Sequence, residues 1–247
     1  MEKIEDREVP RYIYKYMSLD GFIEMATQGS LYFASPTTYN DPFDTKANVK
    51  GKASPEEIKS FWSKLGYGDE EINKIKQLPS SSLNEIANNE YRKILSDFRV
   101  CCFSQISDSI LMWSHYSDMH KGVCVKFDRN KDSLFDSSRL ISYEEQVPEY
   151  NFITGTNDDV NRVIYTKSAH WEYEKEIRIV KHAQQGFTNK VTFKKKALSE
   201  VIFGCRFPEH KKLAVQAILK KYAYHVTLSQ MDTSVEEYKL IKENIQL

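Results

Sequence analysis

The 247-residue chain has few glycines and no excess of either charge, and both shortages narrow its possible functions. Its nine glycines are scattered, and none belongs to the glycine-rich loop with which many folds hold a phosphate. Lys and Arg together number 35, as do Asp and Glu. No net charge therefore points to nucleic acid or to an anionic membrane, and a partner of either kind is neither implied nor excluded.

Long apolar runs and paired cysteines are also missing. No segment approaches the ~20 apolar residues that span a bilayer, and residues 1–8 are mostly charged, so we expect a cytoplasmic protein without a membrane partner. The four cysteines show no Cys-x-x-Cys spacing, which predicts that they are reduced core residues and not zinc ligands. No Gly-x-Ser-x-Gly motif surrounds Ser104, so a serine hydrolase using Ser104 and His115 is set aside.

Aromatic residues are abundant, at 13% of the chain, and they gather in one short segment. Residues 112–116 read Met-Trp-Ser-His-Tyr, which places an indole, a hydroxyl, an imidazole and a phenol within five positions. Helical spacing puts Met112 and Tyr116 on one face and turns Trp113 and His115 elsewhere. We expect some of these groups to face a pocket, and ordinary core packing is an equally weighted alternative.

The order of hydrophobic patterns predicts one α+β domain with a helical insert at about 54–97. A capping box at Ser54 opens the insert, which is expected to hold two or three helices. Residues 148–162 are polar and are predicted to form an irregular loop. The expected strands are 11–17, 31–34, 99–104, 122–127, 140–143, 176–180, 191–193, 201–203 and 223–228, with helices at 18–29 and 208–222 and around 112–116.

The segment 171–180 contains candidate catalytic residues. Strand alternation sends Ile177 and Ile179 to one face and Glu174, Glu176 and Arg178 to the other. If that face lines a cleft, Arg178 can hold one carboxylate ionised while the other contacts a substrate. If it faces water, the three groups form weak ion pairs at a solvated edge.

The loop that contains Asn40, Asp41 and Asp44 offers oxygen ligands for a hard cation, which Glu174 or Glu176 could complete. The alternative is local turn chemistry, because Asn and Asp before proline commonly cap their own backbone.

Several ordered motifs resemble a bacterial family known as domain of unknown function 2971. They are Tyr14-Lys15-Tyr16, Leu31-Tyr32-Phe33, Asn40-Asp41-Pro42-Phe43-Asp44, Cys102-Phe103-Ser104, Met112-Trp113-Ser114-His115-Tyr116, Gly122-Val123-Cys124-Val125-Lys126-Phe127-Asp128, Trp171 with Tyr173-Glu174-Lys175-Glu176-Ile177-Arg178, and Val201-Ile202-Phe203-Gly204-Cys205. These motifs extend over nearly the whole chain. The family name carries no activity.

More distantly, the order of elements is similar to that of ADP-ribosyltransferases that act as toxins or defence enzymes. This resemblance implies a split or twisted β-sheet core and a late strand whose Glu-x-Glu carries the catalytic residue. Glu174-Lys175-Glu176 matches that element, so Glu176 would be catalytic and Glu174 would position the acceptor nucleophile.

The same resemblance implies how NAD would bind. Lys15 would contact its phosphates, Ser104 would support the nicotinamide ribose, and Tyr16 or Tyr116 would stack on a ring. Trp113, His115 and Arg178 complete the expected NAD-binding set, and Asn40, Asp41 and Asp44 form a substrate loop. Two positions depart from the pattern. Lys15 replaces the usual arginine or histidine, and Phe103-Ser104-Gln105 replaces a Ser-Thr-Ser element.

The sequence thus predicts an NAD-dependent ADP-ribosyltransferase-like enzyme, of the kind that serves as a toxin or defence effector, and no metal. Its acceptor, whether protein, nucleic acid or small molecule, leaves no sign, and the insert at 54–97 is the expected docking site for a partner. Two alternatives stay open. One is a non-catalytic nucleotide-sensing or interaction module, and the other is a metal-dependent nuclease using Asp41, Asp44 and Glu176.

Overall fold

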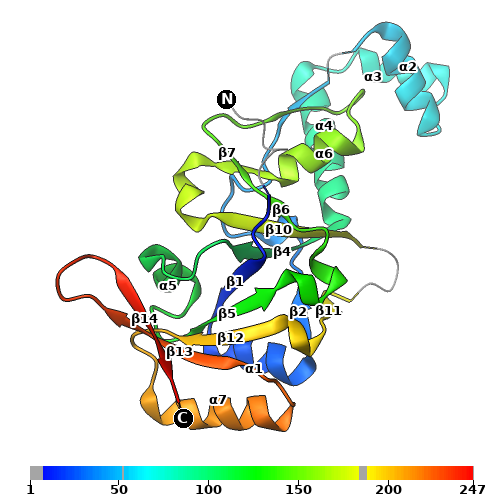
Figure 1. The fold of residues 1–247 in the computed structure, drawn as a ribbon. Helices are drawn as coiled ribbons and strands as arrows, with labels where there is room; N and C mark the ends of the chain where they lie inside the picture. The colour runs from blue at the N-terminus through cyan, green and yellow to red at the C-terminus, as the bar shows by residue number, and fades with distance from the viewer. Residues whose placement is uncertain (1–7, 52, 184–187, 247) are drawn as a thin grey trace.

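An eight-stranded mixed sheet runs through the computed structural model, which describes residues 8–51, 53–183 and 188–246 (Figure 1). In spatial order its strands are β14 (Leu240–Ile245), β13 (Thr227–Thr233), β12 (Leu198–Phe203), β5 (Val123–Asp128), β1 (Tyr12–Met17), β4 (Phe98–Ser104), β10 (Glu176–His182) and β6 (Arg139–Leu140). Strands β12 and β13 are parallel and the other neighbours are antiparallel. The predicted α+β class is confirmed.

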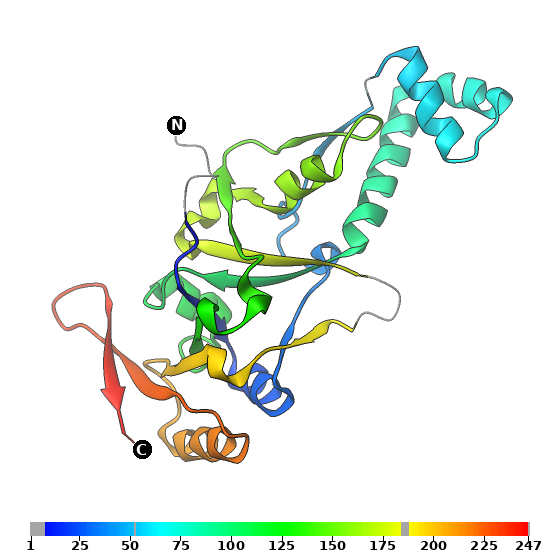
Figure 2. The ribbon, with the colours of Figure 1, turned by 45° about the vertical axis from the view of Figure 1, so that its right-hand side comes forward.

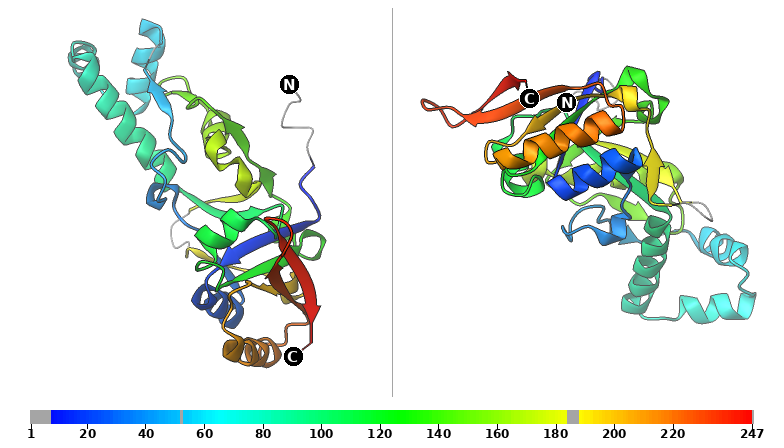
Figure 3. Two further views of the ribbon diagram at one scale, coloured as in Figure 1. Left: turned by 90° about the vertical axis from the view of Figure 1, so that its left-hand side faces the viewer. Right: turned by 90° about the horizontal axis from the view of Figure 1, so that it is seen from below.

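Side-chain alternation along the strands separates two cores on opposite faces of the sheet. On β1, Ile13 joins the larger core, which α1 (Leu19–Gln28) and α7 (Glu209–Lys221) cover. These two helices lie side by side beneath the sheet (Figure 3). Tyr16 points to the other face and packs with Trp113 from α5 (Ile110–Tyr116). Strand β1 therefore supplies side chains to both layers.

Helix α1 begins and ends as its sequence predicts. The Ser18 hydroxyl accepts a hydrogen bond from the Gly21 backbone N–H. Gly29 ends the helix in the left-handed conformation, with φ of 62°, which glycine adopts without strain. These two residues fix where the chain turns from β1 back to β2 (Ser30–Tyr32), whose partner is β11 (Lys190–Thr192).

Three helices occupy the predicted insert: α2 (Pro55–Lys64), α3 (Asp69–Lys76) and α4 (Ser80–Ser96). Helix α4 runs away from the sheet and carries α2 and α3 near its far end (Figure 2). Trp62, Ile72 and Tyr91 from these helices belong to a core that also contains Phe152. The insert is thus anchored through a hydrophobic core that it shares with Val100 of β4 in the central sheet.

The prediction of an irregular loop at 148–162 is wrong. Strand β8 (Glu149–Asn151) pairs with β3 (Asn48–Lys50), and α6 (Asn157–Ile164) follows it. Thr156 caps α6 through Asp159, and the apolar residues of the helix are buried.

The predicted strand at 223–228 begins later, at Thr227, and β14 was not anticipated. The remaining elements near the site are β7 (Ser142–Glu144), β9 (Thr166–Ser168) and the 3-10 helix η5 (Ala169–Glu174). Across the described ranges, no helix has the length and apolar character needed to cross a membrane.

A left-handed turn joins α5 to β5, and a glycine from another part of the chain packs closely against it. Asp118, Met119 and His120 have φ values of 46°, 52° and 67°, a conformation that costs non-glycine residues energy. The backbone of Gly204 packs against this turn so closely that an added Cβ would lie 2.1 Å from the His120 carbonyl oxygen.

We therefore expect Gly204→Ala to lower the free energy of unfolding by about 1–3 kcal/mol, because the turn must shift to relieve the clash. Gly51→Ala is the control, since an added Cβ there meets nothing within 4 Å, and should change stability by less than about 0.5 kcal/mol. Urea denaturation measures both. Equal stability of the two variants would contradict the described packing.

Candidate functional site

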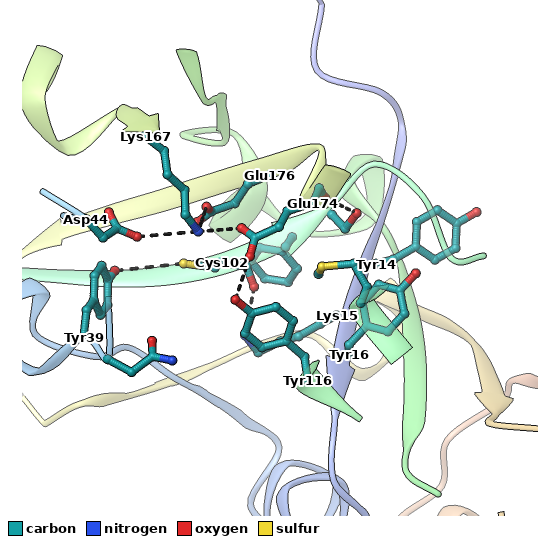
Figure 4. A pocket seen from close by; sticks show the side chains of 14 residues that line it. Tyr14, Lys15, Tyr16, Tyr39, Asp44, Cys102, Tyr116, Lys167, Glu174 and Glu176 are labelled. Carbon is teal, nitrogen blue, oxygen red and sulfur yellow. Dashed lines mark hydrogen bonds and ion pairs between the residues drawn. The ribbon is translucent and has the colours of Figure 1, made fainter. Parts of the chain in front are cut away.

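A cavity of about 180 Å³ opens beside the middle of β1, where β4 ends and β10 begins (Figure 4). Ser104, the last residue of β4, pairs with Tyr14 on one side and with Glu176 on the other. Helix α5, strand β9 and the loop after β2 complete the walls. The lining residues are Tyr14, Lys15, Tyr16, Tyr39, Asn40, Asp44, Cys102, Phe103, Ser104, Met112, Tyr116, Lys167, Glu174 and Glu176.

Most of the residues singled out from the sequence meet at this cavity. Those that line it are Lys15, Tyr16, Asn40, Asp44, Ser104, Tyr116, Glu174 and Glu176. Four others do not line it. Trp113 is fully buried and its indole N–H donates to the Ser107 carbonyl oxygen. His115 is exposed, Arg178 lies behind the lining carboxylates, and Asp41 lines a neighbouring cavity.

Five ionisable side chains form what we call the charged cluster: Asp44, Lys167, Glu174, Glu176 and Arg178. The Lys167 ammonium lies 2.5 Å from Glu174 Oε2, 3.1 Å from Glu176 Oε2 and 3.6 Å from Asp44 Oδ2 (Figure 4). With all five groups ionised, three carboxylates face two cations, so the cluster keeps one negative charge in excess.

Arg178 lies behind the carboxylates that line the cavity and bonds to two carboxylates of the charged cluster. Its Nε donates to Glu176 Oε1 at 2.7 Å, and Nη2 donates to both oxygens of Asp44 at 2.9 and 2.7 Å. Its Nη1 donates to the carbonyl oxygen of Ile164 at 2.6 Å. Because Arg178 is fully buried, these bonds replace the water that its guanidinium loses on folding. The proposal that these charges form a solvated edge is therefore wrong.

Glu174 does not belong to the strand, contrary to the alternation argument. It ends η5, and Lys175 follows in the left-handed conformation with φ of 46° before β10 begins at Glu176. Because of this turn, both carboxylates reach the Lys167 ammonium, although they are not alternate residues of one strand. The Tyr116 hydroxyl donates to Glu174 Oε1 at 2.6 Å, which fixes the second oxygen.

The environment drives the pKa values of the two glutamates apart. Burial raises the pKa of Glu174 above its usual 4.5, and the nearby charge of Glu176 raises it further, despite Lys167. Burial would also raise the pKa of Glu176, but Arg178 and Lys167 outweigh it and lower that pKa to about 2. Two carboxyl groups whose pKa values differ in this way suit different roles, one as a proton acceptor or donor and one as a fixed charge.

Three side chains that were predicted to contact NAD form hydrogen bonds within the protein. The Ser104 hydroxyl donates to the Glu174 carbonyl oxygen at 2.6 Å and accepts from the Ile106 N–H, so it holds the turn that carries Glu174. Lys15 Nζ donates to the Cys102 carbonyl oxygen at 2.9 Å, and the Tyr16 hydroxyl donates to the Ile106 carbonyl oxygen at 3.0 Å. These contacts position the cavity wall. Lys15 is only partly buried, and it lines the cavity.

Lys167 is the main residue that the sequence reasoning missed. It lies on β9, whose partner β7 is more than twenty residues earlier, and no local pattern marks a lysine in such a short strand. Its closeness to the two glutamates in the sequence, at separations of seven and nine residues, was the available signal. Tyr143, whose hydroxyl accepts from the Glu176 N–H at 2.6 Å, was missed for the same reason.

The carboxylates are arranged around protein cations. Lys167 occupies the point where Asp44, Glu174 and Glu176 approach one another. Asp41 Oδ1 accepts from the Phe43 N–H, which is the turn chemistry considered from the sequence. Within the part of the chain that the structure describes, no group of three His, Cys, Asp or Glu residues is placed to hold a metal ion.

One segment of the chain matches a known protein family. The model of a family described as "Protein of unknown function (DUF2971)" matches residues 112–179. This segment belongs to the DUF2971 family. The match confirms the family resemblance over a shorter stretch than the motifs covered, and it includes Tyr116, Lys167, Glu174 and Arg178. No curated protein and no solved structure matches the chain.

We expect Lys167→Met to destabilise the fold strongly, because it leaves the buried Glu174 without a cation and leaves Asp44 and Glu176 with Arg178 alone. Removing one partner of a buried ion pair costs about 3–5 kcal/mol. The matched control is Lys242→Met, whose partner Glu200 is also buried and retains Ser229 and Lys126. Lys242 itself is one-third exposed, so its loss should cost about 1 kcal/mol or less. Chemical denaturation at neutral pH distinguishes the two, and a small, equal loss in both variants would contradict the assigned role of Lys167.

Proposed function

We propose that the protein is an NAD-dependent ADP-ribosyltransferase-like enzyme and that the cavity receives the nicotinamide end of NAD. The observation that carries the proposal is the pair Glu174 and Glu176, held 2.5 and 3.1 Å from one lysine but with pKa values driven in opposite directions. Cleaving the bond between ribose and nicotinamide needs a fixed negative charge beside a developing cation, and transfer needs a proton acceptor.

The charge and lining of the cavity support this substrate. The excess negative charge of the charged cluster favours a cationic ring, and the aromatic side chains Tyr14, Tyr16, Tyr39 and Tyr116 line the cavity that such a ring would enter. Lys15 places a positive charge at the same cavity, which suits a phosphate. A nicotinamide ring with its ribose combines these features.

Glu174 and Glu176 have different roles in the proposed reaction. As the bond to nicotinamide breaks, its electron pair leaves with the ring nitrogen, and Glu176 stabilises the positive charge left on the ribose. The acceptor nucleophile attacks the ribose carbon, and its proton passes to Glu174, whose raised pKa makes it the better base of the two. Arg178 and Lys167 hold Glu176 ionised and oriented throughout.

The nuclease alternative is less well supported, because the Lys167 ammonium already lies where a metal would have to meet the carboxylates. The sensing alternative is favoured by one observation: both oxygens of Glu176 accept hydrogen bonds from Lys167 and Arg178, as a purely structural carboxylate would. We place the enzyme in the cytoplasm, with a role as a toxin or defence effector, and the acceptor docking on the insert at 54–97. These assignments are part of the proposal.

The test is nicotinamide release from NAD by wild type, Glu174→Gln and Glu176→Gln, with and without cell lysate. Each substitution keeps the shape of the side chain and removes its charge, so we expect release to slow by about 100-fold or more. The control is Glu200→Gln, an equally buried carboxylate that bonds to Ser229 and Lys242 and does not line the cavity.

Thermal unfolding of each variant establishes that it is folded before its rate is compared. Release by the wild type that persists in both Gln variants would contradict the assigned roles. Saturable NAD binding without release would favour the sensing module, and the absence of NAD binding would remove the proposal.

A further inference from the structure

The cavity is too small for a whole dinucleotide. Its volume of about 180 Å³ is well below the ~300–1,000 Å³ of pockets that enclose drug-sized ligands. A nicotinamide ring and its ribose would fill it. If the proposed function holds, the other half of NAD must therefore lie on the surface beside the cavity.

Four aromatic side chains form a row beside the cavity. We call them the aromatic row: Tyr116, His115, Tyr173 and Trp171. Their ring centroids are 6.4 Å apart between Tyr116 and His115, 6.3 Å between His115 and Tyr173, and 5.8 Å between Tyr173 and Trp171. Tyr116 lines the cavity and is 37% exposed, so the row begins at the opening.

The row remains open to solvent. His115 is exposed, and Tyr173 and Trp171 are partly exposed. The other two tryptophans, Trp62 and Trp113, are buried, with exposed fractions of 6% and 0%. Helix α5 carries one half of the row and η5 the other, and these elements pack against each other. A connected group of accessible rings beside a cavity is typical of a surface that binds a planar ligand.

The row is also connected to the charged cluster. The Lys167 ammonium lies over the Trp171 ring, 5.0 Å from its centroid, while it bonds to Glu174 and Glu176. The Tyr116 hydroxyl, at the other end of the row, bonds to Glu174. A ligand that covers the row would therefore touch Tyr116, which bonds to Glu174, and Trp171, which contacts the lysine bonded to both glutamates.

We propose that the aromatic row binds the adenine base of the NAD molecule whose nicotinamide end enters the cavity. The inference rests on the proposed function for the identity of the dinucleotide. Stacking on aromatic side chains needs only the flat face of a base, and the fused rings of a purine cover more of an indole than a single ring does. The row would hold the half of NAD that the cavity cannot enclose.

The test measures the Kd of three probes by calorimetry: AMP, nicotinamide mononucleotide and NAD. In Trp171→Leu and in Tyr173→Leu, the Kd for AMP and for NAD should rise about tenfold, the usual effect of losing one stacking side chain. The Kd for nicotinamide mononucleotide should change less than about twofold, because that ligand occupies the cavity and Lys167 keeps its bonds to Glu174 and Glu176 in both variants. Trp171→Phe keeps a ring and should recover most of the lost affinity.

Tyr67→Leu is the matched control. Tyr67 is a partly exposed tyrosine whose ring centroid lies 5.2 Å from that of Trp62, as Tyr173 lies 5.8 Å from Trp171, but it belongs to the insert. It should leave all three Kd values unchanged. Unchanged AMP affinity in both row variants, or an equal loss of nicotinamide mononucleotide affinity, would overturn the inference.

Failure of this inference and failure of the proposed function give different results. If wild type releases nicotinamide but does not bind AMP, the aromatic row is not the adenine site and the transferase proposal stands. If AMP binds through the row and no nicotinamide is released, the row stands as a base-binding surface and the transferase proposal fails.

Discussion

The site depends on the burial of two cations, Lys167 and Arg178, among three carboxylates at the end of the central sheet. Buried charges are tolerated only when each is paired and hydrogen-bonded. This requirement determines the surrounding structure: the loop with Asp44 must reach β10, β9 must bring Lys167 beside η5, and Glu174 must leave the strand. The cavity, the divided pKa values and the position of Tyr116 follow from that arrangement.

The layers of the fold could be predicted from the sequence because their signals are local. The expected strand at 11–17 agrees with β1, and the expected helix at 18–29 agrees with α1, whose ends Ser18 and Gly29 mark. Helix α6 was not recognised because its buried residues are few and polar residues surround them. Those residues pack in a core that includes residues of β4, β8 and the insert. Such tertiary support leaves little trace in a short segment of sequence.

The site could be predicted only in part. Lys15, Ser104, Tyr116 and Glu176 were expected to converge, and they line one cavity. Lys167 was missed because a parallel pairing of β7 with β9 places it, and nothing in the local pattern indicates that pairing. Trp113 was expected at the ligand but is buried under Tyr16, since helical spacing alone cannot tell which ring of a cluster faces a pocket and which faces the core.

The central claim is that one environment holds two neighbouring glutamates in different protonation equilibria. Its most direct test is a ¹³C NMR titration of the side-chain carboxyl carbons, assigned with Glu174→Gln and Glu176→Gln. The account predicts that Glu174 titrates above its usual 4.5 and that Glu176 stays ionised as the pH falls below 4.5 towards about 2. Parallel titration of both groups near 4.5 would contradict it, because Lys167 and Arg178 would then not distinguish the two carboxylates.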